Sequence, residues 1–271
     1  MATKKQKTTI PKKTAQKLKP WHFILLIAVP LIVFGRSVFF GFVMHDDDKM
    51  ITENTVIKEG FNPAVAFKTD AWFMDARIEL YRPWQSITYM VDYAIGKENP
   101  MVYHIHNLLI FIAGALLLFL LLQYYFKPIL AWAGALLYSV NLLTPHAAGW
   151  IAARGDLYLM LFGTGFLVLL MRYLRTNSKA ALWLSAPVFF MALLSKESAV
   201  ALLPIALVII YAEKKRMPAG AEWAWFGVNA VLLAGYMAMR SPAIADAGNL
   251  SALAFFRNVR SLPEEYFKMI V

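Results

Sequence analysis

Long, uninterrupted apolar segments constrain the possible folds of this chain more than any other feature. They lie near 21–40, 101–125, 129–143, 156–174, 180–195, 198–212 and 221–239. A membrane-spanning helix needs roughly 20 predominantly apolar residues, because every backbone polar group must be satisfied inside lipid. Apolar residues form 59% of the 271 positions and charged residues only 16%, against roughly 45–50% and about 25% in soluble domains. The sequence therefore predicts an all-α integral membrane protein, a polytopic helical bundle of about seven spans.

The net charge of +10 is concentrated in residues 1–20. This segment has no acid and contains Lys4, Lys5, Lys7, Lys12, Lys13, Lys17 and Lys19. The rest of the chain has 20 basic against 17 acidic residues, so its net charge is only +3. A basic tail beside a first span is typical of a cytoplasmic anchor near anionic lipid, and not of a nucleic-acid-binding face. Residues 1–20 are therefore predicted to be a cytoplasmic tail that leads into an uncleaved signal anchor.

Basic residues in short loops indicate the orientation of the bundle. They follow the second, fourth and sixth spans as Lys127, then Arg172, Arg175 and Lys179, then Lys214, Lys215 and Arg216. These loops share the side of the tail only if residues 180–211 form two helices. One continuous helix there would be about 48 Å long, far longer than a hydrocarbon core of about 30 Å. We therefore predict a break at Lys196 and Glu197, and a multi-pass protein with a cytoplasmic N-terminus.

The same count of membrane crossings places three connections on the outer side of the membrane: 45–100, 144–155 and 195–198. The first of them contains ten of the seventeen acids, namely Asp46, Asp47, Asp48, Glu53, Glu59, Asp70, Asp75, Glu79, Asp92 and Glu98. Its many aromatic residues predict short amphipathic helices on the membrane, with Tyr81 and Trp84 at the headgroups. Polar groups from several segments are thus expected to meet at one surface.

The predicted organisation has three parts. Residues 1–20 form the tail, and residues 21–240 form the transmembrane domain that includes the extracytoplasmic loop 45–100. Residues 241–271 form a further extracytoplasmic segment. We expect the chain to be the N-terminal part of a longer protein, because it stops without a closing polar tail.

Several polar groups on the outer side can carry chemistry, although each also has a structural interpretation. A carboxylate of the triplet 46–48 can act as a general base or bind a divalent cation, and the triplet also suits a solvated helix end. Arg82 can pair with a lipid phosphate or with a nearby acid. Arg154 and Asp156 can pair with each other where a span begins.

The remaining polar positions carry weaker signals. Lys196 and Glu197 lie in a turn, where polar residues are common. His104 and His106 are two positions apart and do not share a helix face, so they fit interfacial hydrogen bonding better than metal ligation. None of these positions specifies a function by itself.

Taken together and in order, four segments resemble the GT-C class of membrane glycosyltransferases. They are FVMHDDDKMITEN at 42–54, YRPWQSITYMVDYAIGKENPMVYHIHN at 81–107, PHAAGWIAARGDL at 145–157 and LLSKESAV at 193–200. The pattern is similar to that of the transmembrane and tetratricopeptide-repeat protein O-mannosyltransferases and their bacterial relatives. The resemblance implies a GT-C-like bundle with a large first extracytoplasmic loop, located in the bacterial inner (cytoplasmic) membrane.

The resemblance also implies a reaction. A sugar would pass from a polyprenyl-phosphate donor to a hydroxyl of a protein or glycan acceptor on the non-cytoplasmic side. The acid pair would be Asp46 and Asp47, with Asp46 as general base. Arg82, Arg154 and Lys196 would hold the departing lipid phosphate. The other candidate binding residues are His106, His146, Asp156 and Glu197.

Departures from the pattern leave alternatives open. Relatives often carry a His-Pro-x-His-x-Glu run before the tryptophan that corresponds to Trp150, whereas here only His146 stands at the glutamate position. Asp48 is an additional acid. A variant reaction, with transfer to a lipid or a diphosphate-linked glycan, would use the acids to bind a divalent metal. The alternatives from other classes are a membrane transporter or lipid flippase and a non-catalytic membrane scaffold.

Overall fold

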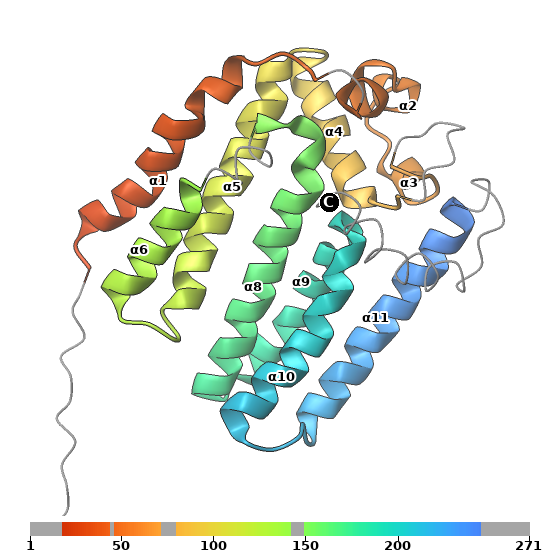
Figure 1. Ribbon diagram of the computed structural model, residues 1–271. Coiled ribbons are helices and arrows are strands. Elements are labelled where there is room, and N and C mark those ends of the chain that lie inside the picture. Colours follow the sequence, from red (N-terminus) through yellow and green to blue (C-terminus); the bar gives the residue numbers. More distant parts are fainter. Residues whose placement is uncertain (1–17, 44–45, 72–79, 142–148, 245–271) are drawn as a thin grey trace, which may run out of the picture.

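The computed structural model describes residues 18–43, 46–71, 80–141 and 149–244, and within these ranges every regular element is helical (Figure 1). The elements are α1 (Pro20–Phe34), η1 (Gly35–Phe39), η2 (Asp48–Thr52), α2 (Thr55–Lys58), α3 (Pro63–Ala66), α4 (Pro83–Gly96), α5 (Pro100–Leu122), α6 (Pro128–Ser139), η3 (Ile151–Ala153), α8 (Arg154–Thr176), α9 (Lys179–Ser195), η4 (Glu197–Ala201), α10 (Leu202–Lys214) and α11 (Ala221–Ala243). The all-helical class predicted from the apolar segments is confirmed for these residues.

Local sequence signals explain where many of the helices begin and end. Helices α1, α3, α4, α5 and α6 each start with a proline, whose fixed φ suits the first helical position and whose missing N–H is not needed there. Helix α9 is capped by the Ser178 side chain, which accepts a hydrogen bond from Ala181 N–H. Helices α8 and α10 end at Asn177 and Lys215, both in the left-handed conformation common at helix ends.

Three helical segments in the described part of the chain are long and apolar enough to cross a membrane. They are Pro20–Phe39, Pro100–Leu122 and Ile151–Thr176, and they correspond to the first, second and fourth predicted spans. The first carries large exposed apolar side chains such as Ile24, Ile32 and Phe39. Side chains of this kind are stable when they face lipid, so the chain is a membrane protein.

The other four predicted spans also form helices, but these do not reach the same length and apolarity. Pro128–Ser139 and Lys179–Ser195 are shorter apolar helices, and α6 would be only about 18 Å long. The predicted span 129–143 continues into residues outside the described ranges. Seven spans therefore stay a prediction, whereas three have the dimensions of a crossing helix.

The predicted break between the fifth and sixth segments is present. Helix α9 ends at Ser195, Lys196 is extended with φ −159° and ψ 133°, and the chain then turns through η4 into α10. Successive helices from α8 to α11 run alternately up and down (Figure 1). The basic connections α5–α6, α8–α9 and α10–α11 lie at one end of the bundle, here called the basic end.

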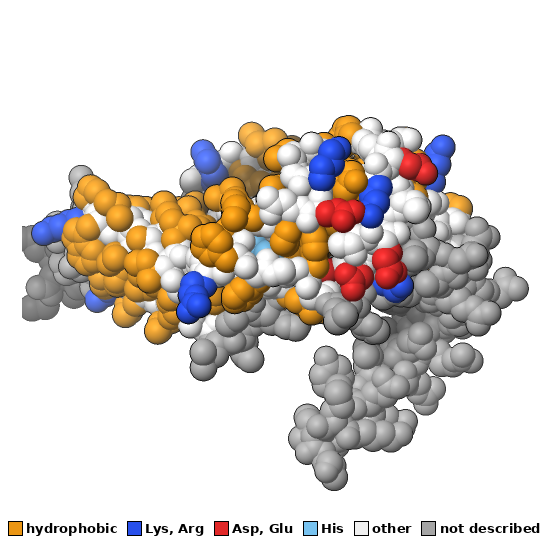
Figure 2. Space-filling model, turned by 90° about the horizontal axis from the view of Figure 1, so that it is seen from above, with side chains coloured by type: hydrophobic (Ala, Val, Ile, Leu, Met, Phe, Trp, Pro, Cys, Tyr) orange, Lys and Arg blue, Asp and Glu red, His pale blue; other side chains and the backbone are white. Residues whose placement is uncertain are grey.

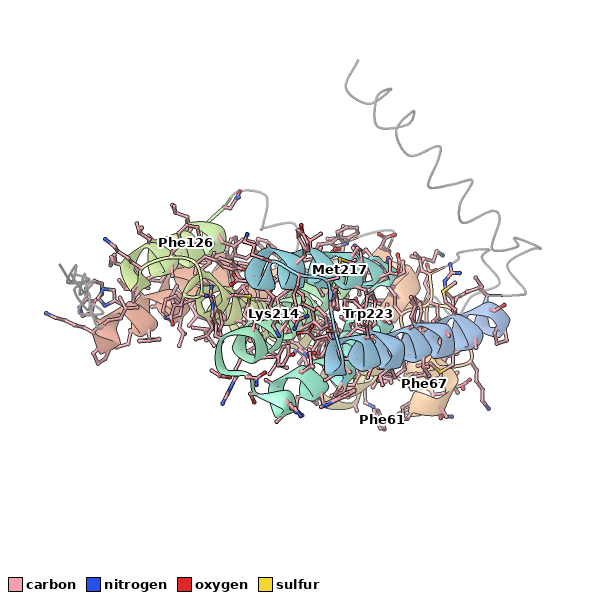
Figure 3. The ribbon with its side chains drawn as sticks, turned by 90° about the horizontal axis from the view of Figure 1, so that it is seen from below. Phe61, Phe67, Phe126, Lys214, Met217 and Trp223 are labelled. Atoms are coloured by element: carbon pink, nitrogen blue, oxygen red, sulfur yellow. The ribbon has the colours of Figure 1, made fainter. Side chains whose placement is uncertain are left out.

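The basic end is organised around a buried acid. Glu222, at the start of α11, accepts hydrogen bonds from Lys214, Arg216 and the Tyr173 hydroxyl. Lys214 lies near Met217 and Trp223 when the molecule is seen from this end (Figure 3). Met217 and Trp223 are exposed, so cations and apolar side chains share this surface.

The main core lies among α8, α9, α10 and α11. In it, Phe166 contacts both Phe189 and Trp225, with ring centroids 5.8 and 5.7 Å apart. Tyr81, which was expected at the headgroups, is instead fully buried in this core, and its backbone carbonyl accepts a hydrogen bond from Tyr236. That expectation was wrong because the segment leading into α4 packs on the bundle.

Candidate functional site

The acid triplet lies at the end of the bundle opposite the basic end, which we call the site end. Asp47 is fully buried, and both of its carboxylate oxygens accept backbone hydrogen bonds. Val43 N–H donates to Oδ2 at 2.9 Å, and Ala152 N–H donates to Oδ1 at 2.9 Å. Asp47 therefore links the chain after the first span to the segment just before α8. This geometry suits a structural clamp.

Burial makes Asp47 a weaker acid than an ordinary aspartate. Loss of water around the carboxyl raises its pKa to about 6. The two backbone hydrogen bonds lower this pKa, and the charges of Asp46 and Asp48 raise it further. Asp46 is only partly buried, and its carboxylate has no hydrogen bond or ion pair within the described residues. Asp48 accepts a hydrogen bond from the Thr52 hydroxyl. Within the described residues, Asp46 is thus the member of the triplet whose carboxylate is partly exposed and makes no hydrogen bond.

Four charged side chains from three separate segments form a cluster, here called the charged quartet. They are Arg82, Asp156, Lys196 and Glu197. The Arg82 guanidinium binds Glu197 through two parallel hydrogen bonds of 2.8 and 3.1 Å, and Lys196 Nζ lies 2.5 Å from Asp156 Oδ1. Four of the predicted binding residues are thus paired with one another.

The charges of the quartet influence one another beyond the two direct pairs. Burial alone would lower the pKa of Arg82, but Glu197 and the more distant Asp156 raise it. Burial alone would raise the pKa of Glu197, but Arg82 and the charge of Lys196 bring it below its ordinary value. Arg82 and Glu197 are therefore both ionised near neutral pH.

Gly155 explains how these segments come so close. A Cβ built at Gly155 would lie 2.8 Å from Gln85 Oε1 and 3.1 Å from the Ser195 carbonyl oxygen. Only glycine allows the first turn of α8 to contact α4 and the end of α9 at this distance. The residue between Arg154 and Asp156 therefore sets the spacing of the site end.

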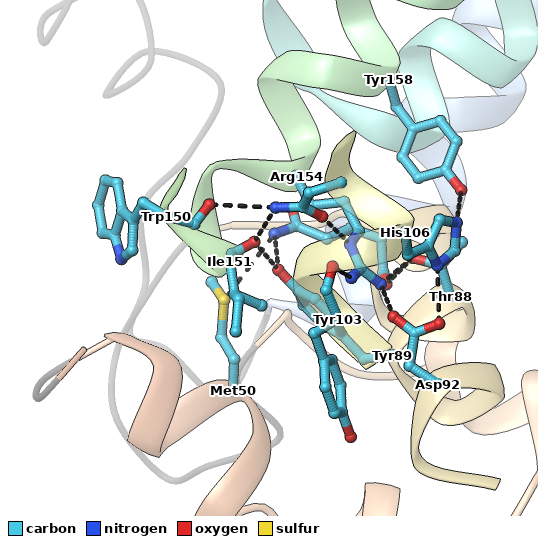
Figure 4. A network of polar contacts seen from close by, with 12 residues as sticks. Met50, Thr88, Tyr89, Asp92, Tyr103, His106, Trp150, Ile151, Arg154 and Tyr158 are labelled. Atoms are coloured by element: carbon cyan, nitrogen blue, oxygen red, sulfur yellow. Dashed lines mark hydrogen bonds and ion pairs between the residues drawn. The ribbon is translucent and has the colours of Figure 1, made fainter. Parts of the chain in front are cut away.

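Arg154 is fully buried at the centre of a second cluster, here called the Arg154 network (Figure 4). Its guanidinium lies 2.5 Å from Asp92 Oδ2 and donates to Asn107 Oδ1 at 2.7 Å. It also donates to the Tyr103 carbonyl oxygen and the Thr88 hydroxyl. Because its donors already have partners, Arg154 is a structural anchor of α4, α5 and α8 in this state.

His106 extends this network toward the surface. Its Nδ1 lies 2.7 Å from Asp92 Oδ1, and its Nε2 lies 2.9 Å from the Tyr158 hydroxyl. Because an ionised carboxylate can only accept, the tautomer whose Nδ1–H donates to Asp92 leaves Nε2 to accept from the Tyr158 hydroxyl. Asp92 thus joins Arg154 to His106.

The structure brings most of the predicted site residues to the site end, in two clusters rather than one. Arg82, Asp156, Lys196 and Glu197 form the charged quartet. His106 and Arg154 belong to the Arg154 network, and Asp47 joins the adjacent backbone at Ala152. His146 lies outside the described residues. Sequence reasoning had no role for Asp92 as the shared partner, or for Tyr158, because no local motif connects α4 with α8.

The surface of the site end is mixed in character. Seen from above, acidic and basic side chains gather over one side, and apolar side chains cover the other side, toward α1 (Figure 2). No group of three or more His, Cys, Asp or Glu side chains in the described residues is placed to hold a metal ion. The arrangement offers paired cations and an accessible carboxylate beside an apolar, lipid-facing bundle.

Comparison with known proteins adds a relationship to this geometry. The chain is 24% identical over 208 residues to a protein O-mannosyl-transferase of Caenorhabditis elegans, a match that covers 73% of this chain and 29% of that protein. It is 23% identical over 194 residues to protein O-mannosyl-transferase TMTC3 of Homo sapiens, covering 68% of this chain and 21% of the relative. The chain thus spans less than a third of the length of these relatives. No protein-family model matches it, and no solved structure does.

Proposed function

We propose that this protein is a membrane glycosyltransferase that moves a sugar from a polyprenyl-phosphate donor to a hydroxyl of a protein or glycan. The observation that carries the proposal is the charged quartet, in which residues from three distant segments converge beside a lipid-facing bundle. The similarity to proteins named O-mannosyl-transferases supports the same reaction class. A GT-C-like architecture with about seven spans is part of this proposal.

The donor phosphate is held by Arg82 and Lys196 in this proposal. Phosphate binds well to a planar guanidinium and to a flexible ammonium group, and both reach the same surface. As the sugar leaves, negative charge develops on the phosphate, and nearby fixed cations stabilise it. Arg154 acts indirectly, because its donors are occupied by Asp92, Asn107 and backbone groups.

The acceptor hydroxyl loses its proton to Asp46 in this proposal. A general base needs an ionised carboxylate that a hydroxyl group can approach, and Asp46 is partly exposed. Asp47 holds the adjacent backbone in position, since both of its oxygens accept backbone amides. The two acids thus have different roles, with Asp46 reacting and Asp47 positioning.

The site end faces away from the cytoplasm in this proposal. Lys127, Arg175, Lys179 and Lys215 are exposed at the opposite, basic end, and basic loops favour the cytoplasmic side. The orientation is thus the multi-pass one predicted from the sequence, with a cytoplasmic N-terminus in a bacterial inner membrane.

The test is sugar transfer by purified Asp46→Asn protein in nanodiscs, with a polyprenyl-phosphate sugar as donor. We expect transfer to fall by at least about 100-fold, as for loss of a general base, while the protein inserts and accumulates normally. Glu53→Gln is the matched control, because it removes another carboxylate of the same segment. That carboxylate is paired with Lys49. Full transfer by the Asp46 variant would refute the assignment of the base. Loss of wild-type transfer with a chelator would favour the metal-dependent variant.

A further inference from the structure

The charged quartet is electrically balanced within itself. It contains two cations and two carboxylates, and each cation is already paired. If the quartet receives a phosphate, as the proposed function requires, at least one carboxylate has to give up its cation. The structure differs clearly between the two pairs, and this difference indicates which one opens.

The Arg82–Glu197 pair is the stronger of the two. It has two parallel hydrogen bonds, and only 12% of the Arg82 side chain is exposed. The Lys196–Asp156 pair has a single contact, and 52% of the Asp156 side chain is exposed. Exposed single-contact ion pairs contribute only about 0–1 kcal/mol, whereas a bidentate guanidinium pair is held more firmly. The Lys196–Asp156 pair is therefore the one that opens at low cost.

We propose that Asp156 occupies on Lys196 the place of the donor phosphate, leaves when the phosphate binds and returns when the product departs. This proposal rests on the proposed function and assigns to Asp156 a role that the resemblance does not give it. Asp156 is suited to the movement because it lies in the first turn of α8 next to Gly155, and its side chain is half exposed to solvent. Arg82 stays paired with Glu197 through Nε and Nη2 and binds the phosphate through its other N–H groups.

The charges of donor and product give the exchange a direction. The donor is a phosphodiester with one negative charge. When the bond between the anomeric carbon and the phosphate oxygen breaks, its electron pair stays on the phosphate. The sugar bonds to the acceptor oxygen, and the proton of that hydroxyl passes to Asp46. The resulting lipid monophosphate carries about −1.5 to −2 at neutral pH, so it binds the two cations more tightly than the donor does. A carboxylate that competes for Lys196 counteracts this product retention.

The test is binding of farnesyl phosphate to the protein in nanodiscs, with farnesol and inorganic phosphate as the probes that separate lipid from free phosphate. We expect Asp156→Asn to bind farnesyl phosphate about two- to fivefold more tightly, the range that a surface ion pair accounts for. Asp156→Ser should behave in the same way. Transfer by either variant should show a lower KM together with a lower kcat, because product leaves more slowly.

Two further variants separate this inference from the proposed function. Lys196→Gln should weaken binding of farnesyl phosphate, and adding Asp156→Asn to it should have no effect. Glu98→Gln is the matched control, because Glu98 also pairs with a lysine and has a similarly exposed side chain, at 50%. Unchanged or weaker binding by the Asp156 variants, with the Lys196 effect intact, would overturn the role of Asp156 alone. Equal binding by wild type and Lys196→Gln would overturn the phosphate site as well.

Discussion

Replacing Arg154 with methionine tests whether this residue is a structural anchor. The change removes the cation that faces Asp92, a carboxylate with 3% of its side chain exposed, and leaves its contact with His106. Removing one partner of a buried ion pair typically costs about 3–5 kcal/mol, mainly because the other charge stays buried without compensation. We therefore expect Arg154→Met to lower the free energy of unfolding by about that amount.

A double-mutant cycle identifies the source of this loss. If the cost comes from the stranded Asp92 carboxylate, adding Asp92→Asn to Arg154→Met should restore part of the stability. The coupling between the two substitutions should then reach about 2 kcal/mol or more, within the range seen for residues in direct contact. Equilibrium unfolding in mixed detergent micelles, followed by tryptophan fluorescence, measures the four proteins.

The matched control is Arg175→Met at the basic end. Arg175 pairs with Glu213, but 48% of its side chain is exposed, so this substitution should cost less than about 1 kcal/mol. Additive effects of the Arg154 and Asp92 substitutions on the free energy of unfolding would refute the role of Arg154 as a structural anchor. So would an Arg154→Met protein as stable as wild type that has lost only its affinity for lipid phosphate.

Two further predictions concern the neighbouring segments. Gly155→Ala should destabilise the fold by about 1–3 kcal/mol, because the new methyl group meets Gln85 Oε1 at 2.8 Å and a backbone carbonyl at 3.1 Å; a thermal melt unchanged from wild type would contradict this. Asp47 should make stability depend on pH, because its folded-state pKa of about 6 lies above the ordinary value of 3.8. Its contribution is fully present below about pH 4 and is lost as the pH rises through about 6, since the folded state then gives up a proton that the unfolded state released earlier. The difference in unfolding free energy between wild type and Asp47→Ala, measured from pH 4 to 7, should follow that sign.

The sequence predicted the features that depend on local composition. Apolar runs indicated the helices. The length of residues 180–211 and the basic residues at both ends of this range predicted a break near Lys196, where the backbone is extended. The distribution of basic residues predicted that three connections share one end of the bundle, as Figure 1 shows. These features follow from neighbours in the sequence, which is why they were accessible.

The sequence did not predict which polar groups are partners. Asp47 binds the amide of Ala152, 105 residues away, and Asp92 joins Arg154 to His106 across three helices. Such contacts depend on how the helices pack, and a single sequence contains no signal for them. For the same reason the sequence did not show that the donors of Arg154 are directed into the protein.

Three consecutive residues at the start of α8 have unlike surroundings. Arg154 is enclosed by α4 and α5, Gly155 touches its neighbours at the closest permitted range, and Asp156 reaches solvent. Turning the helix by one position, or about 100°, would bring a side chain into the glycine contact and take Arg154 away from its partners on α4 and α5. The register of α8 is thus fixed by both residues. Movement at this end consequently has to come from rotation of side chains, while helix α8 keeps its position.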